Sequence, residues 1–202
     1  LNDPDKQWHG SWGGTFGKAK TKNPYTVTWA REENYGDFQM YIENSETWSF
    51  QGTDYSNIYA PIFRWREDFQ NDFRARMDWA VNSYKNANHN PVASVNSDNS
   101  SNILYIAVKA GETITLDGSA STDPDGDSLT FKWWQYREAG TYPAFIPITN
   151  ANSPVCSFTI PDNAEGGQEI HVVLSLYDDG TPKLPDYKRI ILTTTSHRGR
   201  SQ

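Results

Sequence analysis

The chain has 202 residues, with 25 acidic and 18 basic side chains and a formal net charge of −7. This acidic balance argues against nucleic-acid binding, which needs a basic face. No apolar run approaches the ~18 residues of a membrane-spanning helix, so we expect neither a membrane helix nor a membrane partner. The length allows one large or two small domains, with cores built from abundant aromatic side chains: 8 Trp, 11 Tyr and 9 Phe.

The first 60 residues show no sustained hydrophobic period. Trp8, His9 and Trp12 lie among glycines, which predicts either a turn whose indoles fill a core or the aromatic wall of a pocket with His9 at its rim. Residues 23–29 are expected to be a short extended segment, and residues 35–50 a loop.

Residues 61–81 have the pattern of an amphipathic helix. Pro61 suits the first turn of such a helix. Trp65, Phe69, Phe73 and Met77 recur every four residues and form one apolar stripe. We interpret the stripe as a core face that docks on a body lying mostly outside this chain, so the stripe is expected to be bare if that body is absent.

Residues 82–91 are small, polar and end in proline, which indicates an interdomain linker. After the linker the period becomes two, as in β-strands with one buried face. We expect strands near residues 92–96, 103–108, 113–117, 129–136, 155–160, 168–177 and 187–195. Seven short strands separated by turn signals predict an immunoglobulin-like β-sandwich.

The predicted fold is therefore mainly β. An irregular α+β segment with one long amphipathic helix occupies residues 1–86, and the sandwich occupies residues 87–202. Between two strands, residues 123–126 read Asp-Pro-Asp-Gly, the composition of a tight turn. Trp133 alternates with Leu129 and Phe131 and is expected in the core. The single cysteine, Cys156, alternates with apolar residues and is expected to be a small buried hydrophobe.

Several segments of residues 90–180 resemble the polycystic-kidney-disease-type (PKD) immunoglobulin-like domain. The matching motifs are Asn90-Pro-Val-Ala93, Leu116-Asp-Gly-Ser-Ala-Ser-Thr-Asp-Pro-Asp-Gly-Asp127, Phe131-Lys-Trp133 and Val172-Val-Leu-Ser-Leu-Tyr-Asp-Asp-Gly180. The resemblance implies a candidate Ca²⁺ site at Asn90, Asp125 and Asp178 or Asp179. From the residues alone, Asp123, Asp125 and Asp127 alternate like the first positions of a calcium loop. The alternative is a turn whose carboxylates only cap backbone N–H groups.

A second resemblance covers nearly the whole chain. Its motifs are Trp8…Trp12-Gly-Gly14, Phe63-Arg-Trp-Arg-Glu-Asp-Phe-Gln-Asn-Asp-Phe73, Arg76-Met-Asp-Trp79 and Trp133-Trp-Gln-Tyr136…Gly140-Thr-Tyr142. This set is similar to the nucleoside-hydrolase-related family of exported, carbohydrate-associated bacterial proteins, sometimes labelled cellulose-binding. The resemblance implies that residues 1–86 are the end of a hydrolase-like domain whose N-terminal part is the missing partner.

In nucleoside hydrolases an N-terminal aspartate cluster holds Ca²⁺ and activates water, and no such motif follows an apolar strand here. We therefore expect no catalytic residues in this chain. The family also implies a periplasmic or extracellular location, although no signal peptide is visible. Because the sequence begins at Leu1 rather than Met, we expect a processed form or a piece of a longer protein.

The candidate carbohydrate contacts are at the end of the predicted strand 129–136. Trp134 and Tyr136 share the face opposite Trp133, and aromatic rings on such a face can stack on sugars. Gln135 and Glu138 could bind sugar hydroxyls. Trp134 could instead pack beneath the preceding domain. Three functions remain open: a carbohydrate-binding or domain-positioning module, part of a glycosidic-bond hydrolase, and an inert spacer.

Overall fold

The computed structural model describes residues 3, 5–18 and 41–195. The predicted extended segment at residues 23–29 lies outside the described residues. The contacts divide the chain after Arg66 into a smaller N-terminal unit and a larger C-terminal unit, each described here by itself. None of the described helices is long and apolar enough to cross a membrane.

The N-terminal unit is built from short elements. They are η1 (Gln7–His9), β1 (Phe16–Lys18), β2 (Tyr41–Glu43), β3 (Glu46–Phe50), β4 (Thr53–Asn57) and α1 (Ala60–Phe63). Strands β1 and β2 form one antiparallel pair, and β3 and β4 form another. The prediction of a loop for residues 35–50 is therefore wrong for the described part, residues 41–50. Strands β2 and β3 are only three and five residues long, too short to produce a sustained alternation in the sequence.

The C-terminal unit begins with α2 (Arg66–Val81) and η2 (Tyr84–Asn86). The predicted single helix is thus divided near Trp65, since α1 ends at Phe63 and α2 begins at Arg66. Phe73 and Met77 are 63% and 51% exposed, as expected for a stripe without its docking body, whereas Trp65 is buried. The expectation that the stripe docks on a body outside this chain stays a prediction.

The face of α2 that is buried here carries Asp68, Asp72 and Ala75. The hydroxyls of Tyr177 and Tyr187 both donate to Asp68 Oδ2, and the first of these bonds measures 3.3 Å. These two hydrogen bonds connect the helix to strands β9 and β10.

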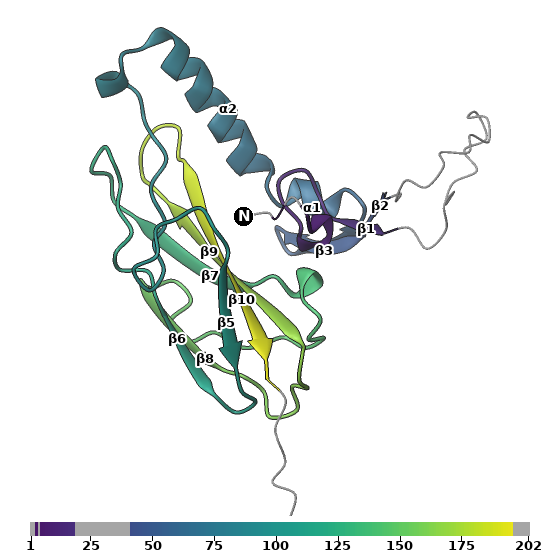
Figure 1. Ribbon diagram of the computed structural model, residues 1–202. Coiled ribbons are helices and arrows are strands. Elements are labelled where there is room, and N and C mark those ends of the chain that lie inside the picture. The colour runs from purple at the N-terminus through teal and green to yellow at the C-terminus, as the bar shows by residue number, and fades with distance from the viewer. Residues whose placement is uncertain (1–2, 4, 19–40, 196–202) are drawn as a thin grey trace, which may run out of the picture. The chain divides into compact units, whose positions relative to one another are not determined.

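The remainder of this unit is a sandwich of two sheets. Its strands are β5 (Leu104–Val108), β6 (Thr113–Asp117), β7 (Thr130–Gln135), β8 (Val155–Thr159), β9 (Glu169–Tyr177) and β10 (Pro185–Thr194). One sheet has the order β5-β10-β9-β7 and the other pairs β6 with β8; both are visible in Figure 1. All pairs are antiparallel except β5 with β10, which is parallel.

These strands confirm the predicted fold class, and six of the seven expected strands are present. The expected strand at residues 92–96 forms only isolated bridges. Two backbone amides of this segment donate to side chains instead of to a neighbouring strand: Ala93 N donates to Asp186 Oδ2 and Ser94 N donates to Ser121 Oγ.

The core lies between the two sheets and is made by the residues that alternate inward. It includes Leu116, Trp133, Leu174 and Leu192. Trp133 is buried as predicted, and its Nε1 donates to Ser153 O at 2.9 Å. Cys156 is also buried, and desolvation raises the pKa of its thiol to about 12, which confirms the prediction of an inert core residue.

Candidate functional site

The Asp-Pro-Asp-Gly turn between β6 and β7 folds around the side chain of Asp123. Asp123 Oδ1 accepts hydrogen bonds from Asp125 N at 2.8 Å and from Asp127 N at 3.1 Å. Gly126 has a φ of +84°, a conformation that glycine adopts without steric cost. The turn predicted from the sequence is confirmed, and its curl brings Asp123 and Asp127 to one side.

Asp178 reaches the same place from the end of β9. It is fully buried, and its Oδ1 accepts from Leu184 N at 2.8 Å and Gly180 N at 3.3 Å. Its Oδ2 accepts from the side-chain amide of Asn88 at 2.8 Å. Burial raises the pKa of Asp178, and the hydrogen bonds from Leu184, Asn88 and Gly180 oppose that rise.

Asp123, Asp127 and Asp178 together form an acidic cluster in which one carboxylate oxygen of each lies within 4.8 Å of the others. Desolvation and then repulsion from the neighbouring aspartates raise the pKa of Asp127. Asp123 Oδ2 is a buried atom with no hydrogen-bond partner within the described residues. A buried acceptor without a donor is costly unless something cationic pairs with it.

This set of oxygens fits a divalent cation. Hard cations such as Ca²⁺ take carboxylate and carbonyl oxygens as ligands. Three convergent carboxylates also repel one another until a cation neutralises them.

Hydrogen bonds connect the linker after α2 to Asp178 and to the acidic turn. Trp79 Nε1 donates to Asn88 O at 2.6 Å, and Asn88 Nδ2 also donates to Pro182 O at 2.8 Å. His89 N donates to Asp125 Oδ2 at 2.7 Å, while His89 Nδ1 lies 3.1 Å from the same carboxylate. These bonds hold the linker against the acidic turn.

A groove of about 610 Å³ lies beside the acidic cluster. Its wall is formed by the linker, the acidic turn and the loop after β9, through Tyr84, Lys85, Ala87, Asn88, Pro124, Asp125, Asp127, Gly180 and Thr181. The ring of Tyr84 stacks on that of His89, with centroids 3.7 Å apart and planes at 21°. Tyr84 is nevertheless 68% exposed, so much of its ring remains open to the groove and solvent.

The metal ligands implied by resemblance are only partly gathered here. Asp178 belongs to the acidic cluster, but Asp125 binds His89, and Asn90 Nδ2 donates to Pro185 O at 2.9 Å. The carboxylates that the structure brings together are those of Asp123, Asp127 and Asp178, and the assignment of Asn90 and Asp125 as metal ligands stays a prediction. The alternating acids at 123, 125 and 127 were the sequence signal for this acidic cluster. Which of the three lie close to Asp178 depends on the backbone conformation of the turn, which the sequence pattern does not give.

The predicted sugar contacts on β7 and just beyond it are engaged within the protein. Trp134 Nε1 donates to Ser175 Oγ at 3.0 Å, and its ring lies 5.1 Å from that of Tyr136. The Gln135 amide donates to Ala144 O and accepts from Ile146 N. Glu138 lies on the short helix η3 (Arg137–Ala139). The assignment of these residues to a sugar site stays a prediction.

The residues predicted as a pocket wall lie in the N-terminal unit. Trp8 and His9 belong to η1, with their rings edge to face at a centroid distance of 6.0 Å. A cavity of about 150 Å³ beside this loop is lined by other residues: Asp3, Lys6, Gln7, Gly10, Ser11, Gly13, Gly14 and Phe16. The structure therefore gives a small cavity near the predicted residues without Trp8, His9 or Trp12 in its wall.

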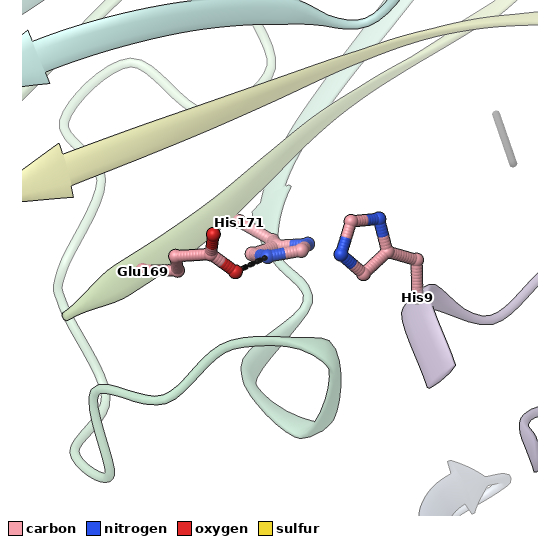
Figure 2. Close-up of side chains that lie close together, drawn as sticks. All are labelled: His9, Glu169 and His171. Carbon is pink, nitrogen blue, oxygen red and sulfur yellow. Dashed lines mark ion pairs between the residues drawn. The ribbon is translucent and has the colours of Figure 1, made fainter. Parts of the chain in front are cut away.

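One further titratable pair lies on β9. Figure 2 shows His171 beside Glu169, where His171 Nε2 lies 3.5 Å from Glu169 Oε2. The other ring nitrogen of His171, Nδ1, lies 3.1 Å from Arg189 Nη1. The pair thus belongs to a row of polar contacts across β9 and β10.

Part of the sandwich matches a known family model, and most of the chain matches a solved structure. Residues 113–194 match the family model described as "Cellulose-binding protein Sde0182, C-terminal domain". A solved structure of a nucleoside hydrolase-related hypothetical protein from Saccharophagus degradans, associated with carbohydrate metabolism, matches 96% of this chain. That match has 38% sequence identity and a TM-score of 0.82. The chain spans 44% of the length of that protein.

Other matches are weaker. The PKD domain from the KIAA 1837 protein matches with a TM-score of 0.36 and 20% identity, over 50% of this chain and 86% of that domain. We draw no conclusion from a match at that score. No curated protein matches the chain. The family-model match and the Saccharophagus degradans match confirm the resemblance predicted from the sequence: residues 113–194 match the model of the Sde0182 C-terminal domain, in a chain similar to part of a nucleoside-hydrolase-related protein linked to carbohydrate metabolism.

Proposed function

We propose that this chain is the C-terminal portion of a longer, exported protein of carbohydrate metabolism, and that its sandwich binds carbohydrate in the groove beside the acidic cluster. The groove is the observation that carries the proposal. It combines an exposed aromatic ring with carboxylates and an amide. The domain that carries it matches a family model described as the C-terminal domain of a cellulose-binding protein.

The chemistry of the groove suits a sugar. The exposed face of Tyr84 can stack on the apolar face of a pyranose ring, with His89 supporting it from behind. Asp125, Asp127 and Lys85 supply polar groups that can bind hydroxyls along the same wall. By contrast, the indole N–H of Trp134 and both ends of the Gln135 amide already have partners. We therefore assign the sugar to the groove.

We further propose that Asp123, Asp127 and Asp178 hold a Ca²⁺ ion. Bound there, the ion would neutralise the three carboxylates and pair with the buried Asp123 Oδ2. The ion would join the turn to the end of β9, and Asn88 connects Asp178 while His89 connects Asp125 to the linker that carries Tyr84. Ion binding would thus hold the two walls of the groove in place.

Affinity electrophoresis tests the sugar site. The chain would migrate through gels containing soluble cellulose derivatives, xylan or β-glucans. We expect retardation by at least one polymer, loss of retardation in Tyr84→Ala, and no change in the control Phe145→Ala, whose exposed ring lies outside the groove lining. Retardation lost in Trp134→Ala but kept in Tyr84→Ala would move the site to β7. Unretarded migration in every gel would favour an inert spacer.

The ion is tested separately by thermal unfolding with Ca²⁺ or with chelator. A ligand that binds only the folded state raises the unfolding temperature. We expect Ca²⁺ to raise it in the wild type and in Asp162→Asn, an exposed aspartate outside the acidic cluster, but not in Asp127→Asn. An equal response in all three proteins would refute the site, whatever the glycan gels show.

The parent protein could also be a hydrolase, which the description of the Saccharophagus degradans relative as nucleoside hydrolase-related favours. Its Ca²⁺-binding aspartate cluster would then lie outside this chain. Assay of the longer protein on nucleosides and aryl glycosides, with and without chelator, tests this candidate. Cell fractionation with an antibody against this chain tests export.

A further inference from the structure

The hairpin of β3 and β4, together with α1, presents a cluster of aromatic rings that we call the aromatic face. Its members are Trp48, Phe50, Tyr55, Tyr59 and Phe63. Strand β3 and helix α1 are labelled in Figure 1, and β4 follows β3 along the chain. Register places the rings together, because Trp48 pairs with Tyr55 and Phe50 with Thr53, while Thr47, Ser49, Asp54 and Ser56 alternate to the other side.

The aromatic face is built on a tight hairpin, and its rings contact one another. The two residues of the hairpin turn, Gln51 and Gly52, both have positive φ (50° and 80°), as in the tight turns that match strand twist. The ring of Trp48 lies 5.1 Å from that of Phe50, 5.8 Å from that of Tyr55 and 6.5 Å from that of Phe63. Such pairs interact favourably beyond their buried area.

The same face is open to solvent. Phe50 is 48% exposed and Tyr59 57% exposed, and Tyr55 and Phe63 are exposed to a similar degree. Contiguous apolar patches of several hundred Å² usually mark an interaction site. An exposed aromatic face on a small unit therefore indicates a surface made to be covered.

The face is also uncharged. Glu46, which shares the face of β3 that carries Trp48 and Phe50, is buried, where it forms an ion pair with Arg64 at 3.3 Å and accepts from Thr15 Oγ1. Arg64 is held further by a bond to Thr47 O at 3.1 Å. A charged partner would therefore find no complementary group on the aromatic face, and an apolar surface fits it better.

We infer that the aromatic face is the contact surface for the remaining portion of the longer protein, which covers it with apolar side chains. The length relation supports this occupant, because the chain matches only 44% of the related protein while 96% of it is matched there. The inference rests on the proposed function, which makes this chain a portion of such a protein.

Hydroxyl-radical footprinting with mass spectrometry tests the inference, since it measures side-chain access directly. Two preparations are compared: this chain, and the longer protein encoded by its gene. We expect oxidation of Phe50, Tyr55, Tyr59 and Phe63 to be several-fold lower in the longer protein. Phe145, an exposed ring on a loop of the C-terminal unit, serves as control and should be oxidised similarly in both if that loop stays open.

A second measurement uses Phe50→Ser and Tyr59→Ser. Because the rings are half exposed in this chain, each change should shift its unfolding temperature little. In the longer protein the same changes should lower it by about 5 °C or more, as expected for truncating a buried aromatic ring.

Four results would overturn the inference. Equal oxidation in both preparations would show that the longer protein leaves the face open. Low oxidation of these rings already in the isolated chain would assign the face to another part of this chain. Oxidation that falls as the concentration of the isolated chain rises would assign it to a second copy. Protection that appears only with soluble glucan would assign it to sugar. A gene that encodes no longer protein would instead refute the proposed function.

Discussion

The buried carboxylate of Asp68 offers a sharp test of how α2 is held. Asp68 is 8% exposed, and its Oδ2 accepts hydrogen bonds from the hydroxyls of Tyr177 and Tyr187. Replacing Asp68 with Ala removes the acceptor and leaves two donors unsatisfied. A buried unsatisfied donor costs about 1–3 kcal/mol. Both tyrosines are only half buried, so water can reach them, and we expect a total loss of about 2 kcal/mol.

The assay is urea unfolding followed by tryptophan fluorescence, with Glu67→Ala as the matched control. Glu67 is an exposed acid in the same helical turn and should change stability little. Asp68→Asn keeps an acceptor oxygen and should lose less than Asp68→Ala. If Asp68→Ala unfolds at the same urea concentration as Glu67→Ala, the tyrosine bonds do not hold the helix, and the reasoning is refuted.

The pH dependence of the same carboxyl gives an independent check. Desolvation raises the pKa of Asp68, and the two tyrosine bonds only partly oppose this rise. A carboxyl with a raised folded-state pKa stabilises the fold most while protonated. Its contribution is therefore full below its usual pKa, near 4, and is lost as pH rises through the raised value. Relative to Asp68→Asn, the wild type should lose stability across that window.

Three further predictions concern the sandwich. Hydrogen bonds from Ser100, and then Lys188, lower the pKa of Asp98 to about 2, so its stabilising effect should be present above about pH 4 and lost as pH falls toward 2. Thermal unfolding of Asp98→Asn should show a flatter acid limb, and an unchanged limb would contradict this. Cys156 should react with a thiol reagent only as fast as the protein unfolds, and immediate reaction of the native protein would contradict its burial. Trp133→Ala should cost about 3–5 kcal/mol in urea unfolding because it empties a core position; a loss below 1 kcal/mol would show that the core refills.

Local patterns were enough to predict most of the sandwich. Strand β9 places an apolar residue at every second position from Ile170 to Leu176, and Pro124 with Gly126 defines a turn without help from the rest of the chain. Each feature depends on residues close in sequence. That is why the fold class and six strands followed from the sequence alone.

The features that were missed depend on distant partners. The partners of Asp68 lie 109 and 119 residues away, so helical periodicity did not reveal the polar contacts of α2 with the sheet. Likewise, Asp178 meets Asp123 and Asp127 rather than Asp125, because His89 occupies Asp125. The hairpin of β3 and β4 is different: its alternation and its Gln51-Gly52 turn were visible, but the strands are short and lie in a polar segment.

The position of β10 has a consequence for how the chain is made. This last strand lies inside its sheet, between β5 and β9, and residues 190–194 pair with residues 104–108. A ribosome must therefore finish nearly the whole domain before its first sheet strand finds a neighbour. Pairing over such a separation is slow, and until it occurs the edges of β5 and β9 stay open. During synthesis β5 therefore waits for its neighbour until the sandwich is nearly complete, and truncation within β10 would leave β5 unpaired while β9 still pairs with β7.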